Sequence, residues 1–200
     1  MADNPKINSI LDEANRLFLL GKLNEAISYY DKILEENPNH IGSLNNKGYA
    51  LSKLKNYDSA LQCYEVALII DPTDFSVLVN KVSSLRKKGN LEEALSTCDK
   101  ILKLNPNYNI SLYHKERILL EMKRYEESVK CCNAILSDYP TNGDVLFDKA
   151  CNLAMMSRVN EALDTLENCT AQGSQFKIKA KKSPFFKQLL QNQRFQDIML

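Results

Sequence analysis

The amino-acid sequence predicts an all-α solenoid, in which pairs of antiparallel helices repeat along the chain. Two observations lead to this fold class. Prolines recur at intervals of 34 residues, at Pro38, Pro72, Pro106 and Pro140, and small and apolar residues return at the same interval between them. A unit of this length holds two helices of about a dozen residues each, with short turns between them. We therefore expect no strand.

The recurring prolines mark the end of each helix pair. Asn37, Asp71 and Asn105 directly precede three of them, and Tyr139 precedes the fourth. A proline disfavours a helical residue before it and donates no backbone hydrogen bond, so the preceding helix must stop. Within the pairs, Gly21 and Gly89 stand where one helix turns into the next and an unhindered backbone is needed.

The register inside each unit is also repeated. Small residues in the second helix allow two antiparallel helices to approach closely. They are Ala26, Ala60, Ala94, Ser128 and Ala162. Two sets of apolar residues in the first helix also recur every 34 residues. One comprises Ile10, Leu44, Leu78, Leu112 and Leu146, and the other comprises Leu17, Leu51, Leu85, Leu119 and Leu153. This register places the apolar faces of neighbouring pairs against one another, which builds a continuous core.

The spacings resemble those of the tetratricopeptide-repeat family. The second unit carries the signature best, with Leu44, Gly48, Leu51, Ala60, Tyr64, Ala67 and Pro72. The resemblance places five repeats at residues 7–40, 41–74, 75–108, 109–142 and 143–176. It implies a right-handed superhelix whose first helices line a concave groove, and it implies binding of another protein rather than catalysis. It does not name the ligand.

The two ends of the chain depart from the repeat. Residues 1–6 are predicted to be an N-terminal tail. Ser183-Pro184 is typical of a helix start, and apolar residues follow at helical spacing: Phe185, Phe186, Leu189, Leu190, Phe195, Ile198 and Met199. Residues 177–200 are therefore predicted to form a helical cap on the fifth repeat. The alternative is a tail that docks on a partner or on a second copy of the chain.

Composition excludes several classes of partner. The net charge is +1, whereas nucleic acid or an acidic membrane surface would favour a strong basic excess. No apolar run approaches the ~20 residues of a membrane span, and no secretion signal is visible. The six cysteines lack the spacing of a zinc site, and we expect free thiols in a reducing, cytoplasmic compartment.

Catalytic and metal-binding patterns are missing from the sequence. The two histidines, His40 and His114, are too far apart in the repeat to share a metal, and no nucleophile or phosphate-loop motif is present. The sequence thus predicts no enzyme activity, no cofactor and no metal.

A peptide-binding groove is predicted from polar residues on the first helices. Amides suit this role because they donate and accept hydrogen bonds and so hold a peptide backbone whatever its side chains. The phase Asp12, Asn46, Asn80, His114 and Asp148 forms one such series, and Lys53 and Lys87 add basic residues. The predicted groove residues are Asn15, Asn45, Asn46, Tyr49, Asn80, Arg86, Tyr113, His114 and Arg117. The alternative is that the amides only solvate exposed helix faces.

The resemblance also excludes one known type of groove. Family members that clamp the acidic C-termini of the chaperones Hsp70 and Hsp90 carry two asparagines and three cations. Asn15 and Asn46 match the asparagines, but Leu11, Ser76 and Asn80 occupy the places of the cations. Without those charge-assisted hydrogen bonds, we do not expect this chain to be a dicarboxylate-clamp binder.

The sequence therefore predicts a non-catalytic scaffold or adaptor that binds an extended segment of a protein partner. Two alternatives are a structural protein that self-associates through its cap or convex face, and a regulatory subunit of an enzyme. One departure accompanies this prediction. Glu116 occupies the slot of Gly48, where two helices meet, and its carboxylate needs a donor. Ser128 is the first candidate.

Overall fold

The computed structural model describes residues 5–200, and the regular structure in that range is entirely helical. Residues 1–4 of the predicted tail lie outside the described residues. Pro5 and Lys6, which were assigned to the tail, already belong to the first helix. The prediction of an all-α repeat fold without strands is confirmed for the described part of the chain.

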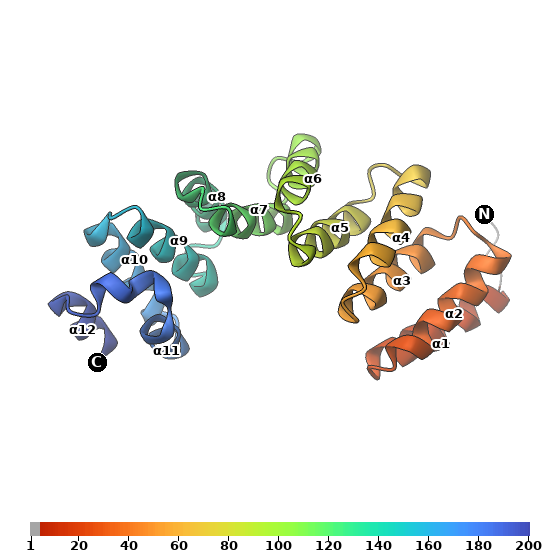
Figure 1. Ribbon diagram of the computed structural model, residues 1–200, viewed down its shortest axis with the longest axis horizontal. Coiled ribbons are helices and arrows are strands. Elements are labelled where there is room, and N and C mark those ends of the chain that lie inside the picture. Colours follow the sequence, from red (N-terminus) through yellow and green to blue (C-terminus); the bar gives the residue numbers. More distant parts are fainter. Residues whose placement is uncertain (1–4) are drawn as a thin grey trace. The chain divides into compact units, whose positions relative to one another are not determined.

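The helices form two compact units along the chain (Figure 1). The N-terminal unit ends at Leu104 and contains α1 (Pro5–Leu19), α2 (Leu23–Glu36), α3 (Ile41–Lys53), α4 (Tyr57–Ile70), α5 (Phe75–Lys88) and α6 (Leu91–Leu104). The C-terminal unit, Asn105–Leu200, contains α7 (Asn109–Glu121), α8 (Tyr125–Asp138), α9 (Gly143–Met155), α10 (Val159–Ala171), α11 (Gln175–Lys182), the 3-10 helix η1 (Pro184–Leu189) and α12 (Gln193–Met199).

Each of the five helix pairs turns through a residue with left-handed backbone. Gly21 and Gly89 have φ of +75° and +92°, as the two glycines in the sequence led us to expect. Lys55, Lys123 and Ser157 stand at the same position of the other pairs, with φ of 64°, 60° and 59°. A side chain in this region is strained, because its Cβ crowds the backbone. The turn geometry is therefore fixed by the helix pair and not by glycine alone.

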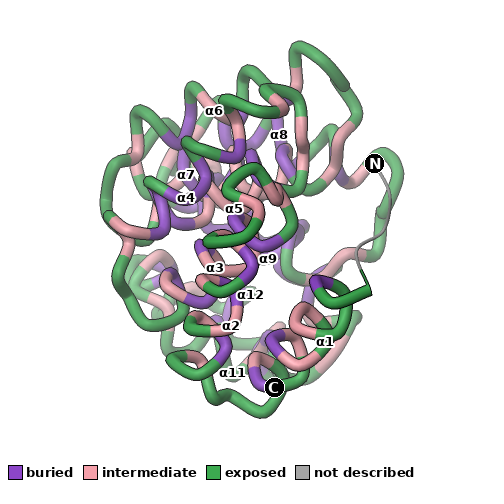
Figure 2. The backbone as a smooth tube through the Cα atoms, turned by 90° about the vertical axis from the view of Figure 1, so that its right-hand side faces the viewer, coloured by how far each residue is buried: buried purple, intermediate pink, exposed green. Residues whose placement is uncertain are grey.

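Small residues sit at the helix contacts, and Figure 2 shows buried segments recurring from helix to helix while the turns stay exposed. Ala26, Ala60, Ala94 and Ala162 are fully buried. Gly48 also lies at such a contact, since a Cβ added there would lie 2.6 Å from Tyr64 Cε1. The absent side chain at residue 48 thus makes room for the tyrosine ring.

The fourth pair fills the same place with a buried carboxylate. Glu116 is fully buried. The Ser128 hydroxyl donates to the Glu116 backbone oxygen at 3.0 Å and lies 3.4 Å from its Oε1, so the expected donor is confirmed. Asn152 Nδ2 in turn donates to Ser128 Oγ at 2.9 Å. The carboxylate is therefore held in a polar network that links α7, α8 and α9.

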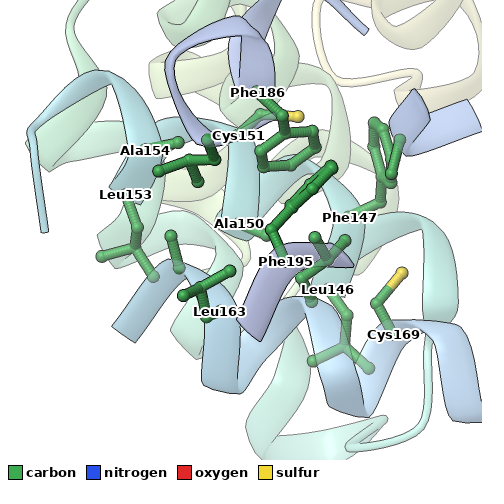
Figure 3. Close-up of a cluster of buried hydrophobic side chains, with 14 of the residues drawn as sticks. Leu146, Phe147, Ala150, Cys151, Leu153, Ala154, Leu163, Cys169, Phe186 and Phe195 are labelled. Atoms are coloured by element: carbon green, nitrogen blue, oxygen red, sulfur yellow. The ribbon is translucent and has the colours of Figure 1, made fainter. Parts of the chain in front are cut away.

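The last three helices cover the apolar side of α9 and α10 (Figure 3). The Phe186 ring stands edge-on to Phe147 at 5.8 Å and lies 5.9 Å from Phe195. Phe176, near the start of α11, packs 6.3 Å from Phe147. Helix α11 begins at Gln175, two residues before the cap predicted from the sequence. These aromatic rings make one core with the fifth helix pair.

The six cysteines are all buried free thiols. Burial raises the pKa of the Cys169 thiol to about 12 and also raises the pKa of Cys63, Cys132 and Cys151. Because the thiolate is the reactive species, these groups stay protonated and inert at neutral pH in the folded chain.

We expect a thiol reagent at pH 8 to titrate six groups in denaturant without reductant. In the native state the same reagent should react slowly, since the raised pKa values keep the thiolate fraction low. The measurement is the absorbance of the released chromophore against time. Fewer than six groups in denaturant would contradict the free-thiol assignment.

Candidate functional site on the first helices

The nine predicted groove residues fall into two groups, one in each unit. Asn15, Asn45, Asn46, Tyr49, Asn80 and Arg86 lie on α1, α3 and α5 of the N-terminal unit. Tyr113, His114 and Arg117 lie on α7 of the C-terminal unit. All nine side chains are half-buried. A single groove that uses both groups stays a prediction.

In the N-terminal unit, four asparagines join the first helices; we call them the amide row (Asn15, Asn45, Asn46, Asn80). Asn46 Nδ2 donates to Asn15 Oδ1 at 3.1 Å, and Asn80 Nδ2 donates to Asn45 Oδ1 at 2.9 Å. Asn46 and Asn80 occupy equivalent positions of their repeats, but they do not bond to each other. Each bonds instead to an asparagine at a different position of the neighbouring repeat. The row consists of staggered pairs, one between α1 and α3 and one between α3 and α5.

This pairing leaves specific atoms of the amide row open to a ligand. Asn15 Oδ1 accepts two hydrogen bonds, from Asn46 and from the Tyr30 hydroxyl at 2.8 Å, while its Nδ2 has no partner among the described residues. Within the same part of the chain, Oδ1 of Asn46 and Oδ1 of Asn80 accept no hydrogen bond. None of these three atoms is buried away from solvent. The row thus presents one amide donor and two carbonyl acceptors.

An apolar hollow, which we call the N-terminal cup, opens beside the amide row. It has a volume of about 320 Å³ and is lined by Asn15, Phe18, Leu19, Tyr30, Asn46 and Tyr49. Phe18 and Tyr49 form its aromatic wall, with ring centroids 5.4 Å apart. Leu19 is 84% exposed and adds apolar surface to the lining. The cup can receive an apolar side chain.

Tyr30 connects the cup to the core. Its side chain is almost fully buried in the cluster with Ala14, Leu17 and Ala26. Burial raises the pKa of Tyr30, so its hydroxyl stays protonated and donates to Asn15. The bond fixes the Asn15 amide with its Oδ1 turned to Tyr30 and its Nδ2 turned away. Phe18, Leu19 and Tyr30 were not among the residues predicted from the sequence.

The second group forms a different arrangement on α7. Arg117 Nη2 donates to the Tyr113 hydroxyl at 2.8 Å, and its guanidinium lies 4.5 Å from the Tyr113 ring centre. Arg117 Nε also lies 3.5 Å from Asp148 Oδ2. Burial raises the pKa of Asp148, and the guanidinium opposes that rise. Arg117 is therefore committed to neighbours on α7 and α9.

No group of His, Cys, Asp or Glu side chains in residues 5–200 is arranged to hold a metal ion. No helix in that range is long and apolar enough to cross a bilayer.

Comparisons with known proteins agree on the fold. A family model of the tetratricopeptide repeat matches residues 42–74, and a second matches residues 17–40 and 75–108. No curated protein matches the chain. The solved structure of YrrB, described as a tetratricopeptide-repeat protein with an unusual peptide-binding site, has a TM-score of 0.72 at 20% identity, covering 87% of this chain and 91% of its own.

Two further solved structures are similar. MamA has a TM-score of 0.75 at 15% identity, covering 88% of this chain and 96% of its own. A tetratricopeptide-repeat protein from Parabacteroides merdae has a TM-score of 0.72 at 18% identity, covering 99% of this chain and 84% of its own. At such identities the likeness concerns the fold. The repeat spacing, the helix pairs and the matched segments agree that the chain contains tetratricopeptide repeats and has the tetratricopeptide-repeat fold.

Proposed function

We propose that the chain is a non-catalytic interaction protein that binds an extended segment of a partner protein across α1, α3 and α5. The observation that carries the proposal is the set of open atoms on the amide row. An extended backbone offers N–H and C=O groups in alternation. The Asn15 Nδ2 donor and the Oδ1 acceptors of Asn46 and Asn80 can bond to both kinds of group whatever the side chains.

Two further features support the proposal. The amides are held in place before a ligand arrives, by Tyr30 and by one another, which lowers the entropic cost of binding. The N-terminal cup adds an apolar anchor site next to the row. YrrB, which has the same fold, is itself described as having a peptide-binding site. In the C-terminal unit, Tyr113, His114 and Arg117 are proposed as contacts of the same kind.

Replacing both Asn46 and Asn80 with alanine should weaken binding of the partner about five- to a hundredfold. The double variant loses both open acceptors and two hydrogen bonds of the row, at about 1–3 kcal/mol in all. The partner would be recovered by cross-linking and pull-down from native lysate, and its affinity measured by calorimetry. Circular dichroism must show unchanged helicity.

The matched control is Asn24→Ala with Gln62→Ala, which removes two exposed amides from the second helices α2 and α4. We expect this control to bind as the wild type does. Loss of binding in the control, with full binding by the Asn46 and Asn80 double variant, would move the site to the second helices. Light scattering on the purified chain tests the alternative of self-association.

A further inference from the structure

Two lysines at the ends of α3 and α5 have no acidic partner among the described residues. Lys53 and Lys87 are exposed and stand 34 residues apart, in the last turns of their helices. Each follows an amide-row asparagine, Asn46 or Asn80, by seven residues. Seven residues are close to two helical turns, so each lysine lies on the same side of its helix as that asparagine.

Two other basic side chains, in the last turns of α1 and α5, are already paired. Arg16 Nη2 lies 2.7 Å from Glu13 Oε1, and Lys88 is paired with Asp58. A basic residue in the last turn is favoured by the helix dipole, which explains a lysine there but leaves its ammonium group free for a ligand. Lys53 and Lys87 therefore form a pair of uncompensated positive charges along the amide row.

The N-terminal cup lies directly beside the first of these charges. The Lys53 ammonium is 5.3 Å from the Tyr49 ring centre, and Tyr49 forms the wall of the cup with Phe18. In the first repeat, the position equivalent to Lys53 is Leu19, which lines the cup. The equivalent positions of α1, α3 and α5 are therefore an apolar site at Leu19 and cationic sites at Lys53 and Lys87.

From this arrangement of sites we infer that the bound segment is an acidic peptide with one apolar anchor. This inference rests on the proposed function. A side chain the size of phenylalanine or leucine enters the N-terminal cup, and two glutamates or aspartates reach Lys53 and Lys87. Packed helices lie about 8–10 Å apart, and an extended chain advances about 3.3–3.6 Å per residue. The two acidic residues are therefore about three positions apart.

The test uses fluorescein-labelled Gly/Ser peptides of defined sequence and fluorescence anisotropy at low salt. One peptide carries a phenylalanine followed by two glutamates three positions apart, and a second has the reversed sequence, since the direction of the segment is open. Matched peptides replace both glutamates with glutamine, or the phenylalanine with serine. We expect one of the two glutamate peptides to bind best, and added salt to remove its advantage over the glutamine peptide.

Lys53→Gln and Lys87→Gln should each weaken binding of the glutamate peptide about fivefold. Lys103→Gln is the control, because Lys103 is exposed in the last turn of a second helix, α6. Equal affinity of the glutamate and glutamine peptides, an equal effect of Lys103→Gln, or no binding of either glutamate peptide at millimolar concentration overturns the inference.

The outcomes separate this inference from the proposed function. Should the glutamine peptides bind as well as the glutamate peptides, and the Asn46 and Asn80 double variant bind neither, backbone recognition stands and the acidic preference falls. Random-sequence peptide display against the wild type and the same double variant supplies the second readout. Failure to enrich any peptide on the wild type counts against the proposed function itself.

Discussion

Deletion of residues 177–200 is expected to unfold the C-terminal unit. The deleted segment contributes side chains to the core formed with α9 and α10, namely Ala180, Phe186, Leu189, Phe195 and Met199. Truncating a single buried phenylalanine costs about 3–5 kcal/mol, and a whole domain is stable by about 5–15 kcal/mol. The loss of two phenylalanines with their neighbours therefore exceeds what the unit can tolerate. Urea titration followed by circular dichroism measures the effect.

The N-terminal unit has its own core, so the truncated chain should retain the helicity of α1 to α6 and lose that of α7 to α10. Phe186→Ala should lower the free energy of unfolding by about 3–5 kcal/mol, because its ring is fully buried. Lys187→Ala, at the exposed neighbouring residue, is the control. A truncated chain as helical per residue and as stable as the intact one would instead favour a segment that docks elsewhere.

Substitution of Gly48 by valine is expected to destabilise the N-terminal unit by at least 1–3 kcal/mol, the usual range for overpacking. The new Cβ would lie 2.6 Å from Tyr64 Cε1, and the ring cannot retreat because it is fully buried. Tyr64→Cys alone should also lower the free energy of unfolding of the N-terminal unit by about 3–5 kcal/mol, because it leaves a cavity nearly as large as the ring.

The double variant should lose less stability than the sum of the two single variants. The third repeat already contains this combination, because Val82 and Cys98 stand at the equivalent positions and are both fully buried. We expect a favourable coupling of more than about 1 kcal/mol, measured by urea unfolding of all four proteins. Additive losses would show that the two positions do not share one space.

The complementary sizes of the residues at these two positions follow from the repeat, and other features of the fold can be predicted from the sequence in the same way. The prolines and the alanine phase locate the helix pairs, because a helix stop and a close helix contact each require a narrow range of residue types. The Glu116 carboxylate and its Ser128 donor were also predictable, since the repeat places both at one contact. Left-handed turns at Lys55, Lys123 and Ser157 were not, because residues other than glycine give no local signal for them.

The candidate site was only partly predictable for a similar reason. The phase of Asn46 and Asn80 identifies the helix face, but the partner of each amide depends on the stagger of neighbouring helices, which the repeat length does not specify. The N-terminal cup combines residues from α1, α2 and α3. One signal was present: Leu19 stands where the second and third repeats have Lys53 and Lys87, so an apolar side chain replaces a charged one.

The arrangement of the helices also bears on synthesis at the ribosome. Nearly all substantial helix contacts join elements that are adjacent or next but one along the chain. Such local contacts allow rapid folding, because little loop-closure entropy must be overcome. Within each unit, a helix pair can dock on the pair before it as soon as it emerges. The fifth pair is the exception, since its apolar side stays open until Phe186 and Phe195 have also left the exit tunnel. That interval is when a chaperone would find the most exposed apolar surface on the nascent chain.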